Sequence, residues 1–180
     1  TANVPLRVRG QVQPRMPVAV YEDGFEGMPW APSGWMGGVE HLKLDGDQAK
    51  VVHEGSAAVR IRYEGSFGWA GIAWQDPPNN WGDRDGGRDL RGARALELWA
   101  RGEYGGEEVT FGVGLLESDR AFPASSISRV EGITLTRDWR RYRVPLRRKD
   151  LSAIRTGFVV TLTGRATPVT VYLDSIRFVR

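Results

Sequence analysis

The segment AAVRIRYE, residues 57–64, alternates apolar with largely polar side chains. Successive side chains of a β-strand point to opposite faces of a sheet, so this pattern predicts a strand with one buried face and one face in water. The segments 95–101, ALELWAR, and 141–144, RYRV, alternate in the same way. The three together favour an antiparallel sheet packed on one side.

Other segments have the same period or are apolar runs that end at turn residues, and they predict further strands at 17–22, 38–44, 48–53, 69–75, 108–116, 129–136, 156–163 and 168–179. The chain also holds 23 glycines and 10 prolines, which are typical of tight turns between short strands. Ten or eleven strands of this kind indicate an all-β fold, an antiparallel β-sandwich of the jelly-roll type. We expect one sandwich domain over residues 17–180, preceded by an arm or linker over 1–16.

Composition and charge exclude several classes of function. The 180 residues contain no cysteine, which excludes disulfides, a thiolate nucleophile and cysteine-bound zinc. Residues 120–180 carry 13 basic and 4 acidic side chains, but many of these arginines alternate with apolar residues and belong to solvated strand faces. We therefore expect no nucleic-acid partner. No apolar run approaches eighteen residues, so we expect no membrane insertion.

Catalytic groups are few. The two histidines, His41 and His53, lack the close spacing and further ligands of a zinc site. Glycoside hydrolysis needs two carboxyls facing each other across a cleft, and Glu97, the best candidate within a strand, has no evident partner. A small jelly-roll glycoside hydrolase or polysaccharide lyase stays open as an alternative.

The tryptophans are more informative, because five of the seven lie between residues 30 and 81 among Gly, Pro and Asn neighbours. An exposed indole stacks on the apolar face of a sugar ring, whose hydroxyls bond to amides and charged groups. Segment 68–88 combines both kinds of group and predicts a carbohydrate site of Trp69, Trp74, Asn79, Asn80, Trp81, Asp83 and Arg84. Trp69 and Trp74 are five positions apart, so only one of them faces a given cleft. For Trp35, Trp99 and Trp139 a place in the core is favoured.

Four motifs in order resemble the galactose-binding-like jelly-roll modules that bacteria use to bind carbohydrate. They are YEDGF at 21–25 followed by Gly34-Trp35, DLRGARALELWARG at 89–102, LTRDWRRYRVPL at 135–146 and VYLDSIRF at 171–178. The resemblance spans roughly 17–179. It implies a non-catalytic module that recognises a polysaccharide or oligosaccharide. A protein-binding assembly module on the same fold is a second alternative, because a fold does not confer a function.

The resemblance also implies a cofactor, a partner and a location. Modules of this type commonly hold a structural calcium ion where the first and last strands meet, which assigns metal ligands to Glu22, Asp23 and Asp174. Ser175 departs from the motif, which often has a second Asp there, and loop carbonyls would have to complete the shell. We expect a secreted or periplasmic protein that accompanies a linked or separate carbohydrate-active enzyme. The sequence begins at Thr1 without a leader pattern, so we expect that any signal peptide has been removed or was never part of this sequence.

Overall fold

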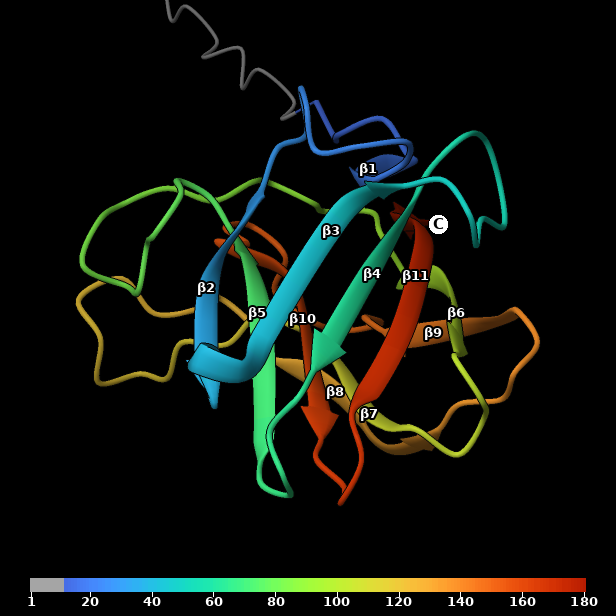
Figure 1. The fold of residues 1–180 in the computed structure, drawn as a ribbon. Coiled ribbons are helices and arrows are strands. Elements are labelled where there is room, and N and C mark those ends of the chain that lie inside the picture. Colours follow the sequence, from blue (N-terminus) through green and yellow to red (C-terminus); the bar gives the residue numbers. More distant parts are fainter. Residues whose placement is uncertain (1–11) are drawn as a thin grey trace, which may run out of the picture.

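The protein folds as a sandwich of two antiparallel sheets in a computed structural model that describes residues 12–180 (Figure 1). Sheet A has the strand order β3-β4-β11-β6-β9, with β1 paired to the end of β11, and sheet B has the order β2-β5-β10-β7-β8. The strands are β1 (Val18–Tyr21), β2 (Ala31–Gly37), β3 (Leu42–Gln48), β4 (Ala58–Tyr63), β5 (Trp69–Gln75), β6 (Ala95–Gly102), β7 (Glu108–Val113), β8 (Ser128–Thr134), β9 (Arg140–Pro145), β10 (Thr156–Thr163) and β11 (Val169–Val179). Within the described residues the only helical element is a 3₁₀ turn, η1 (Val39–His41). The predicted fold class is confirmed.

The core lies between the sheets and consists of the inward side chains of both. Ile61 of β4 and Ile72 of β5 are fully buried, as their alternation requires. Aromatic rings fill the centre of the core, where the centroid of Phe158 lies 5.1 Å from that of Trp74 and 5.9 Å from that of Phe111. A buried Phe or Trp side chain removes about 150–250 Å² of surface from water, so this cluster is a main source of the fold's stability.

One predicted strand is wrong. Gln48 is the last residue of β3, and residues 49–53 form a loop, because the Oε1 atom of Gln48 accepts hydrogen bonds from the backbone N–H groups of Lys50 and Val51. The backbone N–H of His53 then donates to Asp174 rather than to a neighbouring strand. The side chain of Gln48 thus satisfies the backbone that a strand ladder would otherwise use.

One strand was missed. Residues 31–37, APSGWMG, look like a loop, yet they form β2 at the edge of sheet B. An edge strand tolerates Pro32, and the ladder to β5 is irregular between Ala31 and Gly34. Of the predicted arm at 1–16, residues 1–11 lie outside the described residues, and 12–16 contain no strand.

Candidate carbohydrate-binding site

The outer face of sheet B is built from every second residue of its strands. Along β5, Ala70, Ile72 and Trp74 point into the core, so Trp69 and Gly71 point outward. The strand register sets Met36 of β2 and Thr161 of β10 beside Gly71, and it sets Gly112 of β7 beside Val159. A surface hollow of about 220 Å³ lies along this face. Its lining is Met36, Trp69, Thr110, Gly112, Gly114, Leu115, Arg129, Glu131, Val159 and Thr161. We call it the sheet B groove.

Two glycines keep the floor of the groove low. A Cβ atom on Gly71 would lie 2.9 Å from the Thr161 Cγ2 atom and 2.9 Å from the Val160 carbonyl oxygen. A Cβ atom on Gly112 would lie 3.2 Å from the Ser128 carbonyl oxygen. Both glycines are buried, so neighbouring atoms already occupy the space that a side chain would need. The two positions add no bulk to the groove, and an extended molecule can lie close to the sheet.

Trp69 stands at one end of the groove with its side chain 48% exposed. Its indole rests on Gly37, where a Cβ atom would lie 3.1 Å from the ring atoms Cδ2 and Cε3. The φ of Gly37 is +71°, in the left-handed region that favours glycine. Gly37 thus supports the ring from the backbone and leaves the remaining indole surface free for an apolar ligand face.

Polar groups line the rest of the groove. Thr110 and Thr161 are half-buried and lie opposite each other on β7 and β10, and neither hydroxyl bonds to another group within the described residues. Arg129 lies 4.0 Å from Glu117 in an ion pair whose side chains are largely exposed. The two hydroxyls, the Arg129 guanidinium and the Glu131 carboxylate of the lining can donate to or accept from the hydroxyls of a sugar. A ring for stacking beside groups for orientation is the arrangement that carbohydrate recognition needs.

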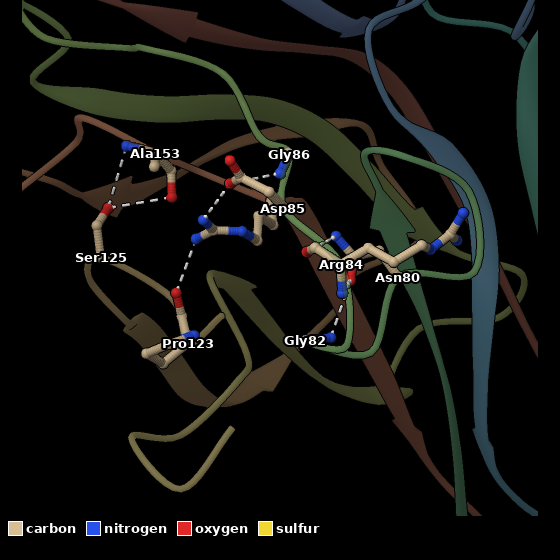
Figure 2. A network of polar contacts seen from close by, with 9 residues as sticks. Asn80, Gly82, Arg84, Asp85, Gly86, Pro123, Ser125 and Ala153 are labelled. Carbon is tan, nitrogen blue, oxygen red and sulfur yellow. Dashed lines mark hydrogen bonds and ion pairs between the residues drawn. The ribbon is translucent and has the colours of Figure 1, made fainter. Parts of the chain in front are cut away.

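A second group of the predicted site residues lies in the loop that follows β5, and Asn80 organises this loop (Figure 2). Its side chain donates to the Arg84 carbonyl oxygen at 2.9 Å and accepts from the Gly82 N–H at 3.0 Å. Asn80 is fully buried, so it shapes the loop rather than facing a ligand. Its neighbour Asn79 is exposed, and the Asn79 N–H donates to the Ser33 hydroxyl at 2.8 Å.

Arg155 ties this loop to the loop that precedes β8. One guanidinium nitrogen lies 3.0 Å from the Asp85 carboxylate and the other donates to the Pro123 carbonyl oxygen at 2.8 Å, the two contacts drawn in Figure 2. The guanidinium also lies over the Phe122 ring, 5.6 Å from its centroid. The Arg155 side chain is only 10% exposed, so its charge depends on these partners.

The structure separates the predicted site residues into three places. Trp69 faces the sheet B groove, and Trp74 is fully buried among core aromatics, on the opposite face as their odd spacing requires. The remaining five lie in the loop at the far end of β5, roughly 20 Å from Trp69 at the usual rise per strand residue. Trp81 is half-buried there, and Asp83 and Arg84 are exposed.

Sequence reasoning missed the groove residues that come from the other strands. Thr110, Gly112, Arg129 and Thr161 stand at outward positions of β7, β8 and β10, and their alternation was visible. What the sequence did not reveal is that β10 lies between β5 and β7, which brings these residues beside Trp69. The core placement favoured for three tryptophans is wrong. Trp35 lies on the core side of sheet B but at its edge, where it is 36% exposed, and Trp99 and Trp139 are half-buried beside His53, outside the core cluster.

Two of the residues assigned to calcium have their oxygens engaged by backbone. Asp174 is fully buried, and its carboxylate accepts from the N–H groups of His53, Glu54 and Ser175 at 2.7–3.0 Å. Burial raises the pKa of Asp174, and these hydrogen bonds partly oppose the rise. The Oδ1 atom of Asp23 likewise accepts from two N–H groups in the loop before β4.

Glu22, the third residue, is exposed and lines a hollow with Asp23 and Glu54. Within residues 12–180 no three carboxylate or imidazole side chains gather as a metal ion requires. Calcium takes six to eight oxygen ligands, and N–H donors directed at Asp23 and Asp174 compete with a cation there. The residues present therefore do not fit a calcium shell by themselves, and the calcium site stays a prediction.

Comparison of the sequence with models of known protein families shows which family the chain belongs to. The family model of carbohydrate binding domain 30 matches residues 19–180. The chain belongs to this family. It is thus a carbohydrate-binding module, as the sequence motifs predicted.

Solved structures share the sandwich. The family 30 carbohydrate-binding module of the cellulosomal cellulase Cel9D-Cel44B of Clostridium thermocellum matches with a TM-score of 0.60 and 19% identity, over 92% of this chain and 98% of that one. Another family 30 module matches with a TM-score of 0.64 and 20% identity, over 92% and 99%. A family 11 module from Clostridium thermocellum, in complex with a β-1,3-1,4-mixed-linked tetrasaccharide, matches with a TM-score of 0.56 and 14% identity, over 91% and 95%. At these identities the likeness shows a common fold.

A comparison with curated proteins gave no match. Among the described residues, the structure has no helix with the length and apolar character needed to cross a bilayer.

Proposed function

We propose that the module binds a neutral β-glucan chain in the sheet B groove, with Trp69 as the stacking platform. The half-exposed indole beside a glycine-floored groove is the observation that carries this proposal. The relatives supply the ligand class, because one structural neighbour belongs to a cellulase and another was solved with a β-1,3-1,4-mixed-linked tetrasaccharide. Glucose rings in β-linkage present flat apolar faces to an indole and equatorial hydroxyls to groups such as Thr110 and Thr161.

The loop after β5 forms the far rim of this surface in our proposal. Asn79, Trp81, Asp83 and Arg84 would contact the end of a longer chain, since roughly 20 Å separates Trp69 from the loop and an oligosaccharide can span that length. Asn80 would act by holding the loop in shape. Trp74 has no part in the proposed contacts, because it lies in the core.

We also propose that the module is secreted or periplasmic and directs a linked or separate carbohydrate-active enzyme to its substrate. The cellulase that carries the related module supports this role. Binding to an insoluble glucan would raise the local concentration of such an enzyme on its substrate.

Isothermal titration calorimetry with soluble β-glucan oligosaccharides tests the function. The parent should bind β-1,4-linked or mixed-linked tetrasaccharides, and a reducing-end assay should detect no release of sugar. A parent that binds no β-glucan on a glycan array would contradict the proposal, and sugar release would favour the hydrolase alternative.

A further inference from the structure

A second surface of the module gathers positive charge, on sheet A and its turns rather than on the outer face of sheet B. Two adjoining hollows, of about 1000 Å³ and 500 Å³, lie where β6 begins and where β9 and β11 end. The basic side chains that line them are Arg94, Arg143, Arg147, Arg148, Lys149 and Arg180. Neither hollow has an acidic side chain in its lining. We call this surface the basic hollow.

Most of these charges have no partner within the described residues. The exception among the arginines is Arg143, whose Nε lies 3.3 Å from Glu97, and Lys149 donates to a backbone carbonyl oxygen. The side chains of Arg94, Arg147 and Arg148 make no ion pair or hydrogen bond in residues 12–180. Elsewhere on sheet A, Arg62 pairs with Glu64 at 2.9 Å, although Arg141 and Arg177 have no ion pair within the described residues. The basic hollow differs from an ordinary wet strand face because six basic side chains line it and no acidic side chain does.

The backbone of the hollow is unusual as well. Arg147, Arg148 and Lys149 are consecutive in the turn after β9, and the Lys149 N–H closes this turn on the Leu146 carbonyl oxygen. Arg148 adopts a φ of +62°, in the left-handed region that non-glycine residues seldom occupy. Like charges on adjacent residues repel, and the surrounding structure has to hold such a strained turn, which is a feature that clusters at functional sites.

From these observations we propose that the basic hollow binds a polyanionic glycan, a polysaccharide that carries carboxylate or sulfate groups. The planar guanidinium group forms paired hydrogen bonds with either anion. No aromatic side chain lines the hollows, so bases of a nucleic acid would find nothing to stack on. Leu146 and Leu151 are almost fully buried, and Pro145 is the one exposed apolar side chain of the lining, so the surface offers too little apolar area to enter a membrane. The class of ligand rests on the assignment of the chain as a carbohydrate-binding module.

Occupation of both surfaces would let one module attach to a neutral glucan through sheet B and to an acidic polysaccharide through the basic hollow. The hollow is built on sheet A and its turns, while the groove belongs to sheet B, so one ligand need not displace the other.

The test compares two double variants of equal net charge. Arg94→Gln with Arg147→Gln removes two charges shared by both hollows, and Arg60→Gln with Arg137→Gln removes two exposed charges elsewhere. Affinity for polygalacturonate and for heparin is measured at about 0.15 M salt, where long-range attraction is screened. We expect the parent to bind at least one polyanion, the first variant to lose about tenfold or more, and the control to stay within about twofold. Binding of polygalacturonate shows that carboxylates suffice, whereas binding of heparin alone shows that sulfate groups are required.

Three outcomes would overturn the proposal: no polyanion binding by the parent at this salt, equal losses in both variants, or equally tight binding of single-stranded DNA. β-Glucan affinity is measured in parallel and should be the same in the parent and both double variants. A parent protein that binds β-glucan but no polyanion would refute only the basic hollow. A parent protein that binds a polyanion but no β-glucan would refute only the function proposed for the sheet B groove.

Discussion

Replacing Trp69 with alanine removes the stacking platform of the sheet B groove. The side chain is 48% exposed, which leaves roughly 120 Å² of a tryptophan's surface of about 250 Å² open to a ligand. At about 25 cal/mol per Å², covering one ring face or all of this surface contributes about 1.5–3 kcal/mol to binding. Trp69→Ala should therefore weaken the affinity for a β-glucan tetrasaccharide by about 10- to 150-fold.

Calorimetry measures this loss, and Trp35→Ala is the matched control. Trp35 is 36% exposed and lies on the neighbouring strand, but its register partner Ile72 places it on the core side of sheet B. Its indole N–H donates to the Pro32 carbonyl oxygen, so the ring is held at the sheet edge. The control should keep its affinity within about twofold. A Trp69→Ala protein that remains folded and binds as tightly as the parent would refute the reasoning.

Four further changes probe the remaining elements of the site and fold. Thr161→Val keeps the shape of the groove but removes a hydroxyl. Glucan affinity measured by calorimetry should fall by about 2- to 13-fold, which corresponds to the loss of one hydrogen bond. An unchanged affinity would show that Thr161 is not part of the site. Arg155→Met leaves Asp85 and the Pro123 carbonyl without their cation, and hydrogen exchange should show faster opening of both loops; unchanged protection would contradict their coupling. Asp174→Ala leaves three N–H groups without an acceptor, so the free energy of unfolding measured by urea denaturation should fall by about 3 kcal/mol or more. Asp174→Asn should recover part of this loss. Equal losses in the two variants would contradict the hydrogen-bonding role of Asp174. Because the folded-state pKa of Asp174 is raised, its contribution is greatest at acid pH and declines as pH rises through that pKa, so the stability advantage of the parent over Asp174→Asn should shrink from acid to neutral pH. Excess calcium should leave the melting temperature unchanged relative to chelator, given the engaged oxygens of Asp23 and Asp174, and a clear rise would support the metal site.

The alternation of side chains predicted most of the fold. Segment 57–64 and segment 156–163 became β4 and β10 because each buries one set of apolar residues that period two places on one face. Segment 31–37 did not follow this rule. It is an edge strand that pairs with one neighbour, β5. An edge strand tolerates Pro and Gly, so segment 31–37 forms a strand without an alternating apolar pattern.

The site was predicted only in part, because parity fixes a residue's face but not its neighbours. The spacing of Trp69 and Trp74 correctly put them on opposite faces, and burial in the core then excluded Trp74 from the surface. The groove, by contrast, joins strands that are distant in sequence. Thr110 lies beside Thr161 only because β10 pairs with β7, and this strand order follows from the packing of the whole sandwich.

Asn80 shows a second limit. Its residue type suggested contact with sugar hydroxyls, whereas its amide is used by the loop itself, through the Gly82 N–H and the Arg84 carbonyl oxygen. An asparagine among turn residues serves either role, and only its burial distinguishes them.

The central claim is that the glucan lies on the outer face of sheet B against Trp69. Nuclear magnetic resonance tests it directly, because each of the seven tryptophans gives its own indole N–H signal. On titration with a β-glucan tetrasaccharide, the Trp69 signal should shift, while the signals of buried Trp30 and Trp74 and of Trp99 on sheet A should stay in place. A shift of Trp99 with Trp69 unmoved would place the ligand on the opposite sheet and contradict the account.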